Sequence, residues 1–238
     1  MSDLLSVNSD AKTVKGLKQG YLTGILYLSP ANSSGRNVCP NATPGCIAAC
    51  LNTAGRAGIP GSNIPAARLR KTREFFIDRA AFIEGLRADI ARLTRRAWRS
   101  GLTPAVRLNG TSDIPWERVA PGLLSDFLGI QFYDYTKSPA RAIAYASGQL
   151  PANYHLTFSL AETEQSKTDA AAVLAAGGTV AAVFSDSNFP TTYLGAPVVD
   201  GDSSDLRFLD PRGSVVALKA KGRARRDTSG FVISTGAA

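Results

Sequence analysis

Six short apolar runs along the chain have the length and residue types of buried strands. Runs of about four to eight residues that are rich in aliphatic and aromatic side chains, and are bounded by Gly, Pro or polar turns, are typical of strands. The six runs occupy residues 22–28, 104–109, 130–135, 154–160, 179–184 and 214–220. A shorter run at 231–234 follows the last of them. The pattern therefore predicts a sheet to which most of the chain contributes.

Between the first two runs, residues 65–99 have the spacing of a long amphipathic helix. An apolar position recurs every seven residues, at Leu69, Phe76, Ile83, Ile90 and Ala97. Asn63 is placed to cap the start, Pro65 suits the first turn, and Gly101 suits the end. Because the segment is longer than most helices of globular proteins, we expect either one long helix or two helices with a break near Gly85.

Helical segments also follow most of the later strands. A short helical region ends near Leu128, and clearer ones lie at 138–148 and 167–178. Strands that alternate with helices are joined by right-handed crossovers in a mainly parallel sheet. No repeat or linker divides the sequence, so we expect residues 1–238 to form a single α/β domain. Its sheet is expected to be open, or to curl into a partial or complete (β/α) barrel.

The composition is that of a globular protein. Apolar residues make up 44% of the chain and charged residues 19%, which argues against a disordered or collagen-like chain. No apolar run approaches the roughly 18 to 20 residues of a membrane-spanning helix, and the first residues lack the pattern of a signal peptide. We therefore expect a soluble, cytoplasmic protein with no membrane partner.

The net charge of +8 is unevenly distributed. Residues 1–120 carry 17 basic and 8 acidic side chains, whereas residues 121–238 carry 10 and 11. An excess of Lys and Arg in one half is typical of proteins that bind a polyanion such as nucleic acid. The alternative is a solvated basic helix face. A second basic run, from Lys219 to Arg226, is a candidate for phosphate contact or a solvated edge.

The three cysteines lie within twelve residues, in the spacing C-x6-C-x3-C formed by Cys39, Cys46 and Cys50. Buried apolar cysteines do not need the turn-forming prolines and small residues that separate these three. A disulfide is unexpected in a chain without an export signal. A structural zinc ion takes four ligands, and the only histidine, His155, lies in an apolar strand where a core position is expected. Zinc and a metal-free loop remain alternatives.

A 4Fe-4S cluster suits three clustered thiolates better. Its irons take soft ligands, and three cysteines leave one iron open to a further ligand. A cysteine loop at about residues 29–62, directly after the first strand of a parallel α/β domain, is similar to the layout of radical SAM enzymes, in which the open iron binds S-adenosylmethionine. The spacing departs from the C-x3-C-x2-C that is usual there. Use of S-adenosylmethionine is therefore an open expectation.

Polar side chains follow the carboxyl ends of three predicted strands, where parallel sheets place their binding sites. The candidate cofactor-binding residues are Asn109, Thr111, Asp113, Asp134 and Lys137. The segment 109–113 holds a place comparable to the glycine and carboxylate segment that binds the methionine amino group in radical SAM enzymes. Helix capping is the alternative role for such residues. We expect them to share one rim with the cysteine loop.

Several distinctive blocks of the sequence resemble the gene product 88 family of actinobacteriophage and prophage proteins. They are KGLKQGYLTGILYLSP, CPNATPGCIAACLNTAGRAG, ARLRKTREFFIDRAAF, AVRLNGTSDIPWE, QFYDYTK, NYHLTFSLAE, VVDGDSSDLRFLDP and AKGRARRD. The resemblance implies a phage or prophage origin and a host cytoplasmic setting, and it carries no particular activity with it.

Two hypotheses for function follow from these features. The first is an iron-sulfur protein with a radical SAM-like fold, for which an enzyme acting on a small-molecule or nucleic-acid substrate is favoured over a pure electron carrier. The second is a nucleic-acid-binding protein that uses the arginine-rich helix 65–99, with a structural cysteine loop.

Overall fold

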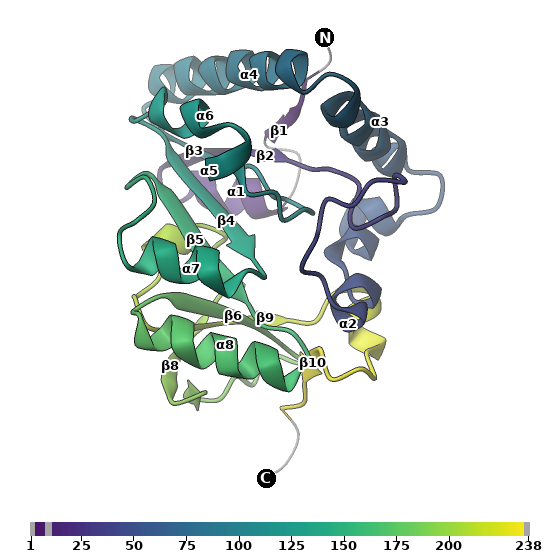
Figure 1. Cartoon of the computed structure of the whole chain (residues 1–238), viewed down its shortest axis with the longest axis vertical. Coiled ribbons are helices and arrows are strands. Elements are labelled where there is room, and N and C mark those ends of the chain that lie inside the picture. Colours follow the sequence, from purple (N-terminus) through teal and green to yellow (C-terminus); the bar gives the residue numbers. More distant parts are fainter. Residues whose placement is uncertain (1–2, 8–10, 236–238) are drawn as a thin grey trace. The chain divides into compact units, whose positions relative to one another are not determined.

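The computed structural model describes residues 3–7 and 11–235 and has a mixed α/β fold (Figure 1). The described residues form ten strands, most of them in parallel pairs. The chain divides into two compact units. The first unit comprises the residues up to Cys39, 63–134 and 150–155, and the second unit comprises 40–62, 135–149 and the residues from Leu156 onward. None of the described helices is long and apolar enough to span a membrane.

The strands of the first unit follow one another in the order β1-β2-β3-β4. They are β1 (Leu5–Val7), β2 (Tyr21–Leu26), β3 (Thr103–Arg107) and β4 (Gln131–Thr136), the last belonging to this unit up to Asp134. β1 is antiparallel to β2, and β2, β3 and β4 are parallel. The three parallel strands thus lie in chain order. β1 is too short to leave a periodic signal, and the sequence pattern did not predict it.

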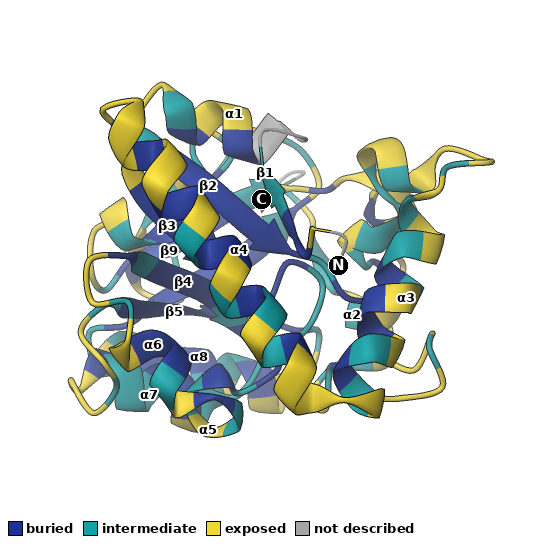
Figure 2. Cartoon of the chain, turned by 90° about the horizontal axis from the view of Figure 1, so that it is seen from above, coloured by how far each residue is buried: buried dark blue, intermediate teal, exposed yellow. Residues whose placement is uncertain are grey.

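Five α-helices accompany these strands. They are α1 (Ala11–Leu17), α3 (Ile64–Ile77), α4 (Arg79–Arg99), α5 (Trp116–Val119) and α6 (Pro121–Ser125). α4 has a buried face that packs against β2 and β3, and Figure 2 shows its alternating buried and exposed bands. A Cβ at Gly24 of β2 would lie 2.9 Å from the Leu93 side chain, so this glycine permits the close approach of helix and strand.

The predicted helical segment is divided at Asp78, and the expected break near Gly85 is wrong. Asp78 leaves the helical region, with φ −139° and ψ 88°, and its carboxylate accepts a hydrogen bond from the Ala81 N–H at 2.9 Å. This bond caps α4 and so starts a new helix. Gly85 lies inside α4, because one glycine costs only about 1 kcal/mol in a helix that buries an apolar face. Asn63 precedes α3 without a side-chain capping bond.

The second unit has the strand order β5-β6-β9-β8-β7, with β10 parallel to β6. The strands are β5 (Tyr154–Ser159, in this unit from Leu156), β6 (Thr179–Phe184), β7 (Thr192–Tyr193), β8 (Ala196–Asp200), β9 (Val215–Lys219) and β10 (Val232–Ile233). The helices are α2 (Pro44–Ala48), α7 (Pro139–Ala146) and α8 (Glu164–Ala175), with 3-10 turns η1 (Leu51–Thr53), η2 (Gly55–Gly58), η3 (Arg207–Leu209) and η4 (Gly222–Arg226).

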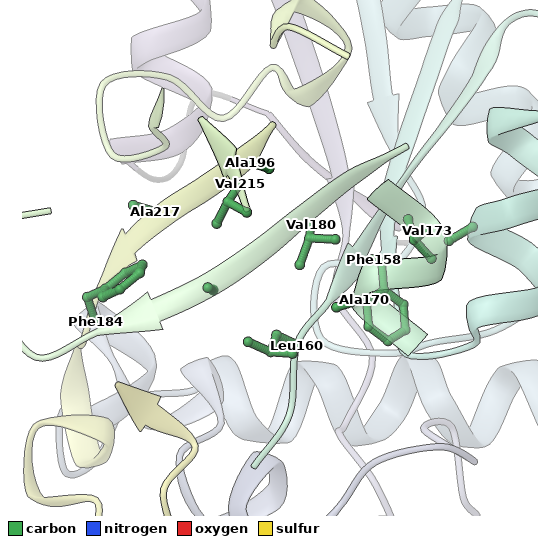
Figure 3. Close-up of a cluster of buried hydrophobic side chains, with 11 residues drawn as sticks. Phe158, Leu160, Ala170, Val173, Val180, Phe184, Ala196, Val215 and Ala217 are labelled. Atoms are coloured by element: carbon green, nitrogen blue, oxygen red, sulfur yellow. The ribbon is translucent and has the colours of Figure 1, made fainter. Parts of the chain in front are cut away.

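The core of the second unit lies among β5, β6, β9 and α8. Figure 3 shows this cluster, which includes Phe158, Val180 and Phe184. Six strands and the helices at α7 and α8 occupy the places predicted from the sequence. β7 and β8 lie in the stretch 185–213, where the sequence analysis identified no strand.

Candidate functional site

Cys39 lies in the first unit, beside the segment that follows β3. Its Sγ accepts a hydrogen bond from the Ala31 N–H at 3.4 Å and donates to the Thr111 carbonyl oxygen at 3.7 Å. The Asp113 N–H donates to the Val38 carbonyl at 2.8 Å. Two of the predicted site residues, Thr111 and Asp113, therefore contact Cys39 and the residue before it, Val38.

Asn109 and Asp134 are brought together at the ends of β3 and β4. Asp134 is fully buried, and its carboxylate accepts hydrogen bonds from the Asn109 N–H at 2.6 Å and from the Tyr154 hydroxyl at 2.9 Å. Asn109 Oδ1 in turn accepts a bond from the Ile114 N–H at 3.0 Å. The hydrogen bond between these two residues joins the end of β3 to β4. A role for them toward a cofactor stays a prediction.

Cys46 and Cys50 lie in the second unit, in α2 and directly before η1. The Thr43 hydroxyl accepts a hydrogen bond from the Cys46 N–H at 3.2 Å and donates to Glu162 Oε2 at 2.7 Å. The Gly45 N–H donates to Glu162 Oε1 at 2.9 Å. One carboxylate from the end of β5 thus holds both the cap and the first turn of the helix that carries Cys46.

Glu162 is a residue of this site that the sequence analysis did not select. Burial acts to raise its pKa, but hydrogen bonds from Thr43 and Gly45, together with the charge of Lys137, outweigh burial and hold the pKa below its usual value. A Cβ at Gly45 would lie 2.5 Å from Ser229 Oγ and 2.7 Å from the Glu162 carboxyl group, so a larger residue at position 45 would force these side chains to shift. The only signal in the sequence was a carboxylate shortly after a strand end.

Lys137, the last of the predicted site residues, also lies in the second unit. Its Nζ donates to the Ser159 and Leu160 carbonyl oxygens at 2.9 and 3.1 Å, and it lies 5.0 Å from the centre of the Phe231 ring. The lysine therefore satisfies carbonyl groups at the end of β5. Its binding to a cofactor stays a prediction.

All three cysteines are partly exposed thiols, and none forms a disulfide. Within residues 3–7 and 11–235, no group of three or more His, Cys, Asp or Glu side chains is arranged to hold a metal ion. The donor chemistry of the set nevertheless fits an iron-sulfur cluster, because three accessible thiols supply soft ligands. Cys39 belongs to the first unit, and Cys46 and Cys50 belong to the second.

A basic surface ends α4 in the first unit. Arg95, Arg96 and Arg99 are exposed there, and the structure gives none of them an ion-pair partner among the described residues. Trp98 lies among them with 65% of its surface exposed, whereas Trp116, the other tryptophan, is fully buried. Arg92, one turn earlier, is instead paired with Asp3 at 2.8 Å and with Asp89.

The chain is similar to a known protein family. Searches of curated proteins and of solved structures gave no significant similarity. The family model described as gene product 88 matches residues 4–235, which is nearly the whole chain. The chain therefore belongs to the gene product 88 family.

Proposed function

We propose that Cys39, Cys46 and Cys50 ligate a 4Fe-4S cluster and that the protein is a cluster-dependent enzyme. The observation that carries this proposal is the contact between Cys39 Sγ and the Thr111 carbonyl oxygen. It places the first cysteine at the carboxyl end of β3, the edge where parallel strands position ligands. The partial exposure of the three thiols supports the same reading, because ligands must be open to an incoming cluster.

The protein's own groups have distinct tasks in this proposal. The Ala31 N–H donates to Cys39 Sγ, and hydrogen bonds to cysteine sulfurs are among the features that set a cluster's reduction potential. Glu162 holds the backbone at Gly45, and with Thr43 it orients the turn that carries Cys46. A bound cluster would supply one-electron chemistry and, with three protein ligands, one iron open to a further ligand.

The finer fold proposal is a partial (β/α) barrel of the radical SAM kind. Its support is that β2, β3 and β4 are parallel and lie in chain order, as strands do in (β/α) barrels. S-adenosylmethionine is the proposed ligand of the open iron. The C-x6-C-x3-C spacing differs from the usual motif, so this ligand is tested separately from the cluster.

Anaerobic purification followed by iron, sulfide and zinc analysis tests the cluster. We expect a brown protein with about four irons per chain, as the cluster stoichiometry requires, and loss of most iron in each of Cys39→Ala, Cys46→Ala and Cys50→Ala. The matched control is Asn41→Ala, an exposed position in the same loop, which should keep its iron. One zinc per chain and no iron would falsify the cluster proposal.

Addition of S-adenosylmethionine should change the electron paramagnetic resonance spectrum of the reduced cluster, and an unchanged spectrum would reject that ligand alone.

A second function, binding of single-stranded nucleic acid at the end of α4, is favoured by Trp98. An exposed tryptophan among arginines combines a surface on which a base can stack with charges that attract phosphates. Because Trp116 is buried, quenching of tryptophan fluorescence by an added oligonucleotide reports mainly on Trp98.

The test of this second function is a salt titration. We expect the affinity for a short single-stranded oligonucleotide to fall steeply between about 50 and 200 mM salt. Changing Arg95, Arg96 and Arg99 together to Gln should weaken binding and reduce that salt dependence. Arg92→Gln is the matched control, since this arginine already pairs with two carboxylates and should matter less. Absence of quenching at 50 mM salt would reject this function.

A further inference from the structure

The basic run from Lys219 to Arg226 divides into two parts with different surroundings in the second unit. Lys221 forms an ion pair with Asp202, and the Lys219 N–H donates to Asp202 Oδ2 at 2.9 Å. Within the described chain, no carboxylate pairs with the guanidinium of Arg223 or Arg226. The Lys221 ammonium is thus paired with Asp202, and Lys219 Nζ donates to Ser187 Oγ at 3.4 Å. The two arginines are available to a ligand.

Arg223 and Arg226 project from the same side of η4. A 3-10 helix has about three residues per turn, so side chains three positions apart lie one above the other. Arg225 falls between them in sequence and therefore on another side of the turn. The two arginines, but not Arg225, line a cavity of about 400 Å³.

The backbone of η4 is fixed against the residues that follow Cys50. Ala224 is buried in a small cluster with Ala49 and Ala220, and the Arg223 N–H donates to Thr53 Oγ1 at 3.4 Å. Gly222 has φ +58°, and a Cβ there would lie 3.0 Å from the Thr53 carbonyl oxygen. The positions from which the two arginines extend are therefore well defined.

The remaining walls of the cavity suit an anion. They are contributed by Ala48 and Ala49 at the end of α2 and by Asp227, Thr228 and Ser229 after η4. The Asp227 carboxylate is bound by its own loop, accepting from Ser229 Oγ at 2.7 Å and from the Val232 N–H at 3.0 Å. Two guanidinium groups and one carboxylate line the cavity, and that carboxylate is already hydrogen-bonded. The Thr228 hydroxyl adds a neutral donor.

We propose that this cavity binds the phosphate group of a small phosphorylated molecule, held by Arg223 and Arg226. A guanidinium group donates two parallel hydrogen bonds to phosphate oxygens, and paired arginines are suited to this recognition. The volume lies in the range of small-molecule sites, roughly 300 to 1,000 Å³. The proposal does not depend on a cluster at the cysteines, because only residues of η4, α2 and the loop after η4 contribute.

Isothermal titration of the full chain with inorganic pyrophosphate and with adenosine monophosphate tests the site. We expect binding of at least one of these probes by the wild type, and at least a tenfold loss of affinity in Arg223→Gln and in Arg226→Gln. Arg225→Gln is the matched control, since it removes the same charge from the same turn without facing the cavity. It should bind within about twofold of the wild type, as a surface substitution usually changes little.

Further variants separate charge from geometry and a small ligand from a nucleic acid. Arg226→Lys keeps the charge but lacks the planar donor pair, so we expect an intermediate loss of affinity. Equal losses in all three glutamine variants would show general charge attraction and overturn the proposal. It would also be overturned if neither probe bound the wild type, or if a single-stranded oligonucleotide bound at this site more tightly than either probe. Circular dichroism of each variant establishes that a loss of affinity is not a loss of fold.

Discussion

Lys71 is a buried cation of the first unit, and its titration makes stability depend on pH. Only 6% of the residue is exposed, and its Nζ donates to the Leu4 carbonyl oxygen at 2.5 Å. Burial, with the neighbouring charge of Arg70 adding to it, lowers the pKa from 10.5 to about 8. Between these values the unfolded chain binds a proton that the folded chain does not, so the free energy of unfolding rises with pH.

We therefore predict that Lys71→Met removes a pH dependence that the wild type possesses. The contribution of Lys71 to the free energy of unfolding should increase by an amount on the order of 3 kcal/mol from about pH 8 to pH 10.5. Urea unfolding of both proteins across this range measures it, and their difference cancels the other titrating groups. Parallel stability profiles would show that Lys71 has an ordinary pKa.

Glu162 is expected to stabilise the second unit through α2. Glu162→Gln removes the charge that receives the Thr43 hydroxyl and the Gly45 N–H, so we predict a loss of about 1 to 3 kcal/mol and faster hydrogen exchange at Gly45 and Cys46. Because the pKa of Glu162 is lowered in the folded state, its contribution is present above the unfolded pKa and is lost as the pH falls through the folded one.

A matched control for Glu162 lies two residues further along. Glu164 is exposed and pairs with Lys167 on the surface of α8 at 2.6 Å. Glu164→Gln should cost less than about 1 kcal/mol, as surface ion pairs contribute little, and should leave exchange at Gly45 unchanged. Equal effects of the two substitutions would contradict the role assigned to Glu162.

At the scale of the elements, the junction of α3 and α4 offers a direct test of capping. Asp78→Ala should destabilise the protein by about 1 kcal/mol, because it removes the bond to the Ala81 N–H. Asn63→Ala, at the start of α3, should cost much less, since the Asn63 side chain makes no capping bond. Urea unfolding of the two variants compares them, and a larger effect at Asn63 would reverse the assignment.

The elements that the sequence predicted well are those with a strong apolar period. Six strands bury most of their residues, so their apolar runs are continuous and easy to recognise in the sequence. They are β2, β3, β4, β5, β6 and β9. β7 has two residues, and β8 has only one buried residue and a proline, Pro197, in its second position, so neither leaves a distinct run. The helix break was misplaced because composition drew attention to Gly85, whereas the side-chain bond of Asp78 decides the boundary.

For the candidate site, the sequence located the segments but not the contacts. The concentration of Cys39, Cys46 and Cys50 and the polar strand ends were visible from spacing alone. That Glu162 holds α2, and that Arg223 and Arg226 share a cavity, depends on residues more than a hundred positions apart in the chain. No local pattern encodes such pairings, and one carboxylate among nineteen acidic residues gives no signal of its own.

At the scale of the whole molecule, each of the two units is assembled from segments that are interleaved in the sequence. Residues 40–62 and 135–149 belong to the second unit although residues of the first unit flank them on both sides. Such an arrangement has no linker between the units, and the single domain expected from the sequence stays a prediction. The basic residues among the first 120 differ in whether a carboxylate neutralises them. Arg70, Arg87 and Arg92 pair with carboxylates, whereas the arginines at the end of α4 keep their charge exposed.

The proposed anion site depends on the number of residues in the short turn η4 as well as on their types. Each residue of a 3-10 helix advances the chain by about 120°. Deleting one residue between Gly222 and Asp227 would keep an arginine-rich segment but rotate one guanidinium out of register with the other. Family members with such a deletion would retain the composition and lose the cavity. A search for related anion sites in this family should therefore match the spacing G-R-x-x-R rather than the number of basic residues.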